Sequence, residues 1–131
     1  MSTFKKHERL SSQKQIAKLV QEGNTFLNYP FRVLWSISKN EHSESFHMQV
    51  AFSVPKRKFK KAVTRNTIRR RMREAFRLNK DRLNEEMEPY PFNLSILIIY
   101  TPARELHYNT IEAGMKKNFE ILKKAIADKT Q

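Results

Sequence analysis

A short segment of the chain carries most of its net charge. Of the eighteen residues from Lys56 to Arg73, ten are lysine or arginine and none is acidic. The rest of the 131-residue chain holds 16 basic and 13 acidic side chains, so the formal charge of +13 comes mainly from this segment. Cations confined to one stretch repel one another in the free protein, and a polyanion relieves that repulsion. The segment therefore predicts a nucleic-acid-binding site, with RNA as the favoured ligand and an anionic membrane as the weaker alternative.

The second half of this segment has the spacing of an amphipathic helix, with apolar side chains on one side. These apolar positions are Ile68, Met72, Ala75 and Phe76. Opposite them, within about one third of the helix circumference, lie the polar positions Asn66, Arg69, Arg70, Arg73 and Arg77. A solvated helix face usually mixes charges of both signs, whereas Glu74 is the only acid between Lys56 and Lys80. We interpret this face as a row of phosphate contacts, in which Asn66 either marks the helix start or contacts a base or sugar.

The first half of the chain predicts one helix followed by strands. Ser12 and Gln15 have the spacing of a capping box, and Gly23 can end the helix that follows. Residues 31–38 and 46–54 alternate apolar and polar side chains, which is typical of half-buried strands. We expect these two strands to pair as a hairpin. Residues 24–29 are either a loop or a further short strand.

The second half predicts a helix, a strand and a final helix. Helical spacing begins near Ala62 and ends near Asn79, before the acidic and proline-bearing residues 85–91. Residues 94–100 are apolar almost throughout, as in a strand covered on both faces, and this predicts a βαβ crossover with the strand before the helix. Asn109 and Glu112 form a second capping box, which opens the last helix. The apolar positions of that helix are Ile111, Met115, Phe119, Leu122 and Ile126.

Composition limits the class of protein. The length predicts a single domain over residues 1–131, with a polar and partly flexible N-terminal arm at 1–10. The absence of cysteine excludes disulfides and thiolate metal sites. Neither an apolar signal segment nor a run of about 20 apolar residues is present. We therefore expect a cytoplasmic protein with no membrane partner and no small-molecule substrate.

No arrangement of side chains in the sequence suits catalysis or metal binding. The four histidines are scattered, without the spacing of ligands or of a general base. Glu85, Glu86 and Glu88 fall in the predicted proline-bearing turn and have no partner base. A self-sufficient nuclease is therefore disfavoured. A generic RNA-binding or ribosomal-type protein with no enzymatic role would also account for the charge.

The stretch KRKFKKAVTRNTIRRRMREAFR closely resembles the signature of the protein subunit of bacterial ribonuclease P. The core of this signature is an Arg-Asn pair, a spacer and an arginine-rich turn ending in Arg-Glu. In this chain those positions are Arg65, Asn66, Arg69, Arg70, Arg73 and Glu74. Residues outside the stretch match the family as well, and they are Phe4, Arg9, Leu10, Gly23 and the pair Ala62-Val63.

The resemblance implies a ribonucleoprotein endonuclease that removes the 5′ leader from precursor tRNA. In such an enzyme the RNA subunit cleaves with Mg²⁺, and the protein binds the catalytic RNA and the precursor without a cofactor or catalytic residue of its own. The implied fold is a two-layer α/β sandwich with about four strands, of the ribosomal protein S5 domain 2-like kind, with a left-handed βαβ crossover. The expected RNA-binding residues are Lys56, Arg57, Lys58, Lys60, Lys61, Arg65, Asn66, Arg69, Arg70, Arg73 and Arg77.

Two features depart from the family pattern. The lysine-rich stretch before Ala62 is one residue longer than usual and lacks its glycine; we expect a flexible cationic loop, with Phe59 either buried or stacked on a base. The family places a leader-binding cleft between the first helix and the sheet, often with aromatic side chains on that helix. Here the corresponding positions are Ile16 and Val20, which cannot stack on bases. The remaining aromatic candidates for the cleft are Phe31, Trp35, Phe52 and Tyr100, each of which can equally be core.

Overall fold

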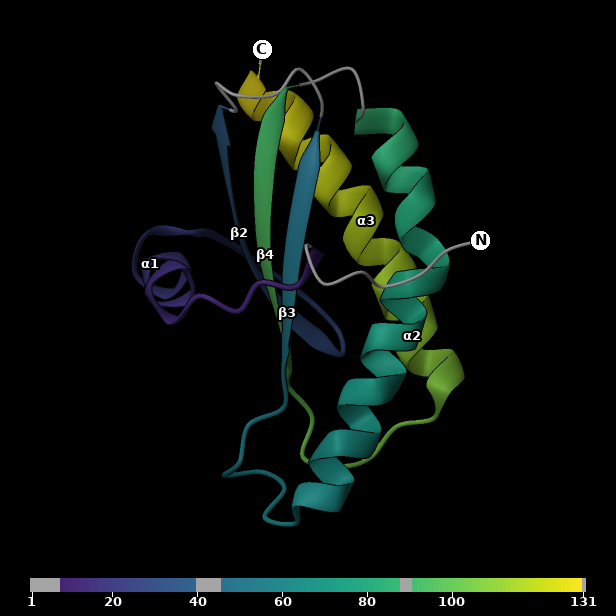
Figure 1. The fold of residues 1–131 in the computed structure, drawn as a ribbon. Helices are drawn as coiled ribbons and strands as arrows, with labels where there is room; N and C mark the ends of the chain where they lie inside the picture. The colour runs from purple at the N-terminus through teal and green to yellow at the C-terminus, as the bar shows by residue number, and fades with distance from the viewer. Residues whose placement is uncertain (1–7, 40–45, 88–90, 131) are drawn as a thin grey trace.

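The computed structural model describes residues 8–39, 46–87 and 91–130, in three helices and four strands (Figure 1). In chain order these are α1 (Gln13–Glu22), β1 (Asn24–Asn28), β2 (Phe31–Lys39), β3 (His47–Ser53), α2 (Ala62–Met87), β4 (Phe92–Tyr100) and α3 (Tyr108–Thr130). The predicted helices and strands are all present. Residues 24–29, left open between loop and strand, contain β1.

The strands form one mixed sheet in the order β1-β2-β4-β3. Strand β4 runs antiparallel to β2 and parallel to β3. The predicted hairpin between β2 and β3 is therefore wrong, because β4 lies between them. Alternation of side chains identifies a strand but not its neighbour. The apolar character of β4 on both faces suits the inner position that it takes.

The connection from β3 through α2 to β4 is left-handed. In Figure 1, β3 is the edge strand nearest the viewer, β4 lies behind it, and α2 lies to the right. Viewed along the direction in which β3 and β4 run, the chain turns counter-clockwise from β3 through α2 to β4. Nearly all βαβ connections have the opposite hand. The handedness implied by the family resemblance is therefore present.

The two faces of the sheet have separate apolar clusters. Odd-numbered residues of β2 and even-numbered residues of β3 and β4 pack against α2 and α3, where the larger core lies. The predicted apolar positions of α2 and α3 are buried in this core. The opposite face is covered by α1, where Leu19 packs with Leu10, Leu34 and Leu97. Helix α1 thus lies alone on one side of the sheet (Figure 1).

The helix ends agree only partly with the sequence. Ser12 caps α1, because its hydroxyl accepts a hydrogen bond from the Gln15 backbone N–H at 3.3 Å, and Gly23 follows the last residue. The predicted end of α2 near Asn79 is wrong. The helix continues to Met87, since Leu83 and Met87 extend its buried stripe. Helix α3 begins at Tyr108, so Asn109 lies inside the helix and not at its cap.

The N-terminal segment extends the sheet beyond β3. Arg9 forms a parallel bridge with Val50, whose carbonyl also accepts a hydrogen bond from the Leu10 N–H at 2.9 Å. The Glu8 carboxylate is buried against Lys80 of α2, with 2.5 Å between Oε1 and Nζ. Residues 8–10 therefore connect α2 to the core beneath α1. Residues 1–7 of the predicted flexible arm lie outside the described part.

Candidate nucleic-acid interface

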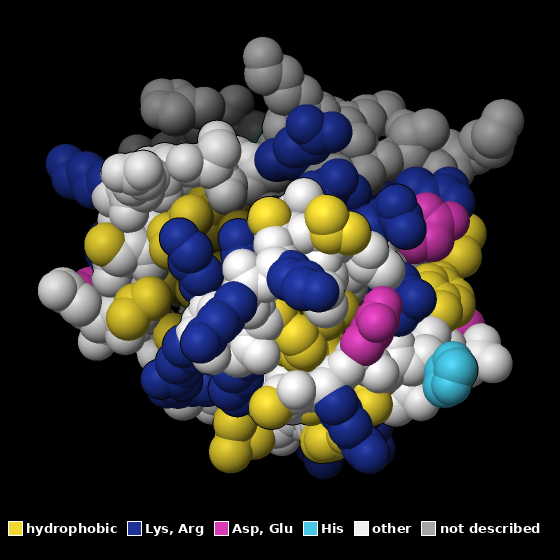
Figure 2. Space-filling model, turned by 90° about the horizontal axis from the view of Figure 1, so that it is seen from below, with side chains coloured by type: hydrophobic (Ala, Val, Ile, Leu, Met, Phe, Trp, Pro, Cys, Tyr) yellow, Lys and Arg dark blue, Asp and Glu magenta, His cyan; other side chains and the backbone are white. Residues whose placement is uncertain are grey.

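The lower end of the molecule in Figure 1 brings together the first turns of α2, the loop before it and the loop from β4 to α3. Figure 2 views this end from below and shows lysine and arginine side chains spread over it, with few acidic ones. The loop before α2 contains the lysine-rich stretch, which we call the basic arch and define as residues 55–61. The basic arch and the arginine face of α2 therefore form one continuous cationic end.

The basic arch is held in place by contacts along its length. The Phe59 ring is buried, with its centroid 6.0 Å from that of Tyr100. The Lys58 ammonium donates to the carbonyl of Thr101, and the Lys58 N–H donates to the Pro55 carbonyl at 3.2 Å. An inward aromatic ring and these hydrogen bonds therefore attach the loop, which the sequence predicts to be flexible, to the core. Phe59, left open between core and base stacking, belongs to the core.

Arg65 is the other contact that orders the basic arch. Its guanidinium donates to the carbonyls of Phe59 at 2.7 Å and Lys60 at 3.0 Å. The side chain is half-buried and lies on the side of α2 nearer the core. Arg65 was predicted to contact RNA, but in the described structure one of its nitrogens bonds only to protein carbonyls. Arg65 therefore stabilises the conformation of the basic arch.

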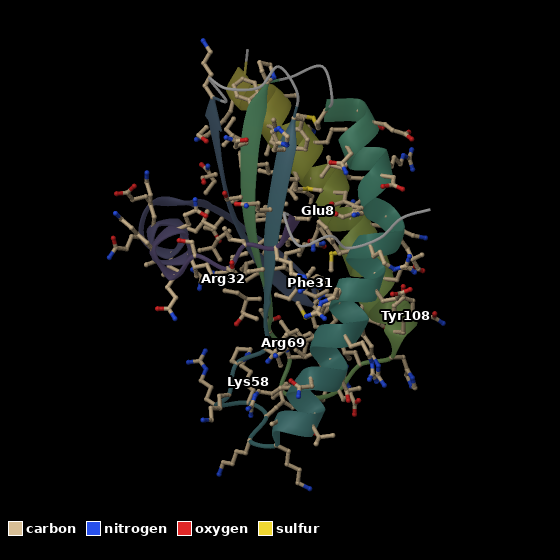
Figure 3. All side chains as sticks on the ribbon, in the orientation of Figure 1. Glu8, Phe31, Arg32, Lys58, Arg69 and Tyr108 are labelled. Carbon is tan, nitrogen blue, oxygen red and sulfur yellow. The ribbon has the colours of Figure 1, made fainter. Side chains whose placement is uncertain are left out.

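Six cations of the site lie on the surface without an internal partner. Within the described part of the chain they form no hydrogen bond or ion pair through their side chains, and all six are exposed: Lys56, Arg57, Lys60, Lys61, Arg70 and Arg73. Asn66 is exposed as well and accepts a hydrogen bond from Arg69 at 3.2 Å. Figure 3 shows Arg69 on α2 just above Lys58 of the basic arch. These residues are the part of the predicted site that the fold leaves available to a ligand.

Other cations of α2 are bound within the protein. Arg71 donates to the Leu106 carbonyl at 2.9 Å and lies 3.1 Å from the Glu105 carboxylate, so it fixes the loop from β4 to α3. Arg77, a predicted RNA contact, forms an ion pair with Glu74. Their hydrogen bond lowers the pKa of Glu74 and raises that of Arg77. The cationic row thus ends at Arg73 in the free protein.

The predicted aromatic lining of a cleft against α1 is wrong. Phe31, Trp35 and Tyr100 are buried in the core with α2 and α3, and Phe52 packs edge-on against Phe76 with 5.6 Å between ring centroids. Successive side chains of a strand point to opposite faces of the sheet. These four residues all point to the face of the sheet that packs against α2 and α3, away from α1, as Figure 3 shows for Phe31.

The α1 side of the sheet has a different set of residues. Arg32 is exposed there, on the opposite side of the sheet from Phe31 (Figure 3), and its strand neighbour is the half-buried Ile99. On α1 itself, Ile16 is half-buried against the small apolar cluster and Val20 is 60% exposed. Sequence reasoning missed Arg32. Its place between Phe31 and Val33 in an alternating strand is the signal that could have identified it.

Side chains that could bind a metal ion do not cluster in the described part of the chain. No group of three or more His, Asp or Glu side chains able to hold a metal occurs there. The cationic end would also repel a divalent cation. Glu85 and Glu86 lie in the last turns of α2, away from the basic arch, while Glu88 and two of the histidines lie outside the described residues. Nor does any described helix have the length and apolarity needed to cross a membrane.

Comparison with known proteins identifies similar chains. The family described as Ribonuclease P matches residues 4–123. The Ribonuclease P protein component of Porphyromonas gingivalis is 33% identical over 113 residues, covering 86% of this chain and 81% of that protein. The corresponding protein of Dictyoglomus turgidum is 30% identical over 131 aligned residues, covering 92% and 96%.

Solved structures support the same fold. The RNase P protein of Staphylococcus aureus superposes with a TM-score of 0.65 at 22% identity, covering 90% of this chain and 97% of that one. The RNase P protein of Thermotoga maritima gives a TM-score of 0.58 at 22% identity, covering 86% and 94%. At these identities the likeness concerns the fold alone, and it agrees with the three helices and four-stranded mixed sheet of this chain.

Proposed function

Because this chain belongs to the ribonuclease P protein family, we propose that the basic arch and the exposed arginines of α2 bind the catalytic RNA of that enzyme. The chain is a ribonuclease P protein subunit, a component of the endoribonuclease that matures the 5′ end of precursor tRNA. Membership in the family implies association with the ribonuclease P RNA. The observation that supports the proposed interface is the set of six exposed cations without internal partners.

The chemistry of these cations suits a phosphate backbone. Arginine presents planar donor groups that match phosphate oxygens in pairs, and Arg70 and Arg73 project such groups from one face of a rigid helix. The lysines of the basic arch add point charges beside them. Asn66 lies next to this row, where its amide can reach a sugar or base edge. The interface therefore combines sequence-independent attraction with one candidate contact that can read a nucleotide.

The α1 side of the sheet is the proposed contact for the leader of precursor tRNA. Val20 and Ile16 offer apolar surface, and Arg32 offers a cation on the same side. Aliphatic side chains cannot stack on bases as aromatic ones do. We therefore expect leader binding here to rest on Arg32 and phosphate attraction more than on base stacking.

The RNA subunit is proposed to perform the cleavage, with Mg²⁺ bound by RNA. The protein supports this division of labour by supplying fixed cations at the interface, which replace part of the charge screening that Mg²⁺ otherwise gives. No residue of the chain is assigned a catalytic role. Such a particle would work in the cytoplasm, where precursor tRNA is made.

Reconstitution with the catalytic RNA tests the proposal. We expect the full chain alone to leave precursor tRNA uncut, and to lower the Mg²⁺ concentration at which the catalytic RNA cleaves it. The Arg70→Ala/Arg73→Ala variant should require more Mg²⁺ than the unmodified chain. Cleavage by the protein alone would contradict the assignment of catalysis to RNA. A full chain without effect on the Mg²⁺ requirement would favour a generic RNA-binding protein.

A further inference from the structure

The turn between β1 and β2 is held rigidly from two directions. The Asn28 side chain donates to the Gly114 carbonyl at 2.9 Å and to the Asn118 side chain at 2.7 Å, both in α3. The Pro30 carbonyl accepts hydrogen bonds from the N–H and hydroxyl of Thr101, at 3.0 and 3.1 Å. A Cβ atom added at Gly114 would lie only 2.6 Å from the Pro30 ring, so helix and turn are in close contact.

Tyr29 lies in the middle of this turn, yet the residue is 59% exposed. The ring therefore adds little to the core, although a tyrosine buries a large apolar area when it packs inside a protein. Its hydroxyl lies beside the guanidinium of Arg104, and this neighbour raises the pKa of Arg104. The backbone of Arg104 is fixed in turn, because its carbonyl accepts a hydrogen bond from the Tyr100 hydroxyl at 2.6 Å.

The turn is directly connected to the basic arch. Thr101 binds Pro30 through its N–H and hydroxyl, and its own carbonyl accepts the ammonium of Lys58. The nearby acid Glu105 does not oppose this charge, since Arg71 lies 3.1 Å from its carboxylate. An exposed aromatic ring and a guanidinium therefore stand beside the cationic end of the molecule.

We propose that Tyr29 and Arg104 form a stacking site for an unpaired nucleobase of RNA whose backbone follows the basic arch. This inference rests on the proposed RNA-binding function and extends it to a residue pair outside the basic segment. Aromatic rings and arginine planes stack on bases of any identity, and basic side chains beside them hold the phosphates. A ring already fixed in position loses little conformational freedom on binding. The site is therefore selective for single-stranded RNA and tolerant of its sequence.

Stacking can be separated from charge with the full chain and a short single-stranded RNA that carries 2-aminopurine. Removing one base–aromatic stack weakens binding by about 5- to 150-fold. Tyr29→Ala should show a decrease in this range and reduce the quenching of 2-aminopurine, while the dependence of affinity on salt keeps its slope. Tyr29→Phe retains the ring and loses only the hydroxyl beside Arg104, so it should bind clearly more tightly than Tyr29→Ala. Unchanged affinity and quenching in Tyr29→Ala would overturn the proposal, and so would a Tyr29→Phe variant as weak as Tyr29→Ala.

Two further sets of measurements check that the variants are folded and identify the RNA that supplies the base. Equilibrium urea unfolding of each variant shows whether it is folded, and Arg104→Lys, which keeps the charge but loses the plane, should weaken binding less than Tyr29→Ala. Precursor tRNA with and without its leader, and the catalytic RNA alone, show which molecule supplies the base. Arg70→Ala/Arg73→Ala is measured in parallel. If that variant weakens binding while Tyr29→Ala does not, the stacking site fails and the proposed interface stands; if neither changes binding, the interface itself fails.

Discussion

The two halves of α2 treat their charges in opposite ways. Residues 62–73 contain five arginines and no acid, whereas residues 74–87 mix both signs. In the second half each cation meets a carboxylate: Arg77 meets Glu74, Lys80 meets Glu8, and Arg82 lies 3.8 Å from Glu86. In the first half Arg71 lies 3.1 Å from the Glu105 carboxylate, but Arg70 and Arg73 have no such partner among the described residues. The same residue types on one helix thus serve the fold where carboxylates are present, and remain available to a ligand where they are not.

The first half of α2, which carries the unpaired Arg70 and Arg73, is also the half where the helix dipole is unfavourable to cations. The N-terminal end of a helix carries partial positive charge, so cations in its first turns are disfavoured there. Helix α2 has no acid in its first turn, and the lysines of the basic arch precede it directly. A sequence selected for stability alone would place acids at this end. The arrangement is understandable if a polyanion binds there.

The largest effect should follow from breaking the buried pair of the second half. Lys80→Met leaves the Glu8 carboxylate buried beside an apolar side chain, which destabilises a protein by about 3–5 kcal/mol. The double variant Glu8→Leu/Lys80→Met removes both charges and should recover most of that stability. Urea unfolding measures the free energies. A single variant as stable as the double one would show that the pair is solvated and not buried.

Substitutions in the first half of α2 should change the stability of the protein less, but should clearly weaken RNA binding. Removing one phosphate contact reduces the salt-dependence slope of binding by about 0.7 to 0.9, so Arg70→Ala/Arg73→Ala should lower it by about twice that amount. The free variant should be at least as stable as the unmodified chain, because like charges three and four residues apart on a helix repel. Fluorescence anisotropy with the catalytic RNA over a range of salt concentrations gives the slope.

Arg82→Ala is the matched control in the second half. Its side chain is 86% exposed, more than any other paired cation of the helix, yet it lies beside Glu86 and away from the basic arch. We expect the salt slope to stay the same in this variant. An equal decrease in both variants would mean that exposure alone, and not the missing carboxylate, decides which cation binds RNA.

The smallest expected effect on binding comes from a variant that removes the carboxylate partner of Arg77. Glu74→Gln removes the carboxylate that holds Arg77 and should extend the cationic row by one position, raising the salt slope by up to about 0.9. Lowering the pH should also release Arg77 and raise the salt slope, because protonation of Glu74 removes its negative charge. The pKa of Glu74 is lowered in the folded chain by Arg77, so the pair stabilises the fold above the ordinary pKa of a glutamate and is lost as pH falls through the lowered value. If Glu74→Gln binds RNA with an unchanged slope, Arg77 does not face the ligand.

Local patterns in the sequence predicted much of the fold. Alternation in residues 31–38 and 46–54 identified β2 and β3, and helical spacing identified the buried side of α2. The sequence pattern places the end of α2 too early, because acidic residues and prolines both occur in 85–91 and only the prolines break a helix. The helix in fact continues through Glu85 and Glu86 to Met87, before Pro89 and Pro91. Period and composition indicate that an element exists, and they place its ends less well.

The candidate site was predicted as a set of residue types, and the structure divided that set. Charge density marked the ten predicted cations alike, yet Lys58, Arg65 and Arg77 bind protein oxygens while Arg70 and Arg73 do not. Tyr29 and Arg104 lie 75 residues apart in the chain, and no local pattern joins them. Their pairing depends on how the turn after β1 meets the loop after β4.

The sequence by itself determined the elements, their apolar faces and the concentration of charge at residues 56–73. These properties follow from the period of each element and from the number of acids and bases in a stretch, both of which are local. Only the tertiary structure decided that β4 lies between β2 and β3 and that Phe31 faces away from α1. It also brought Lys80 to the carboxylate of Glu8. Such pairings join residues distant in the chain, and they are set by the packing of the whole core.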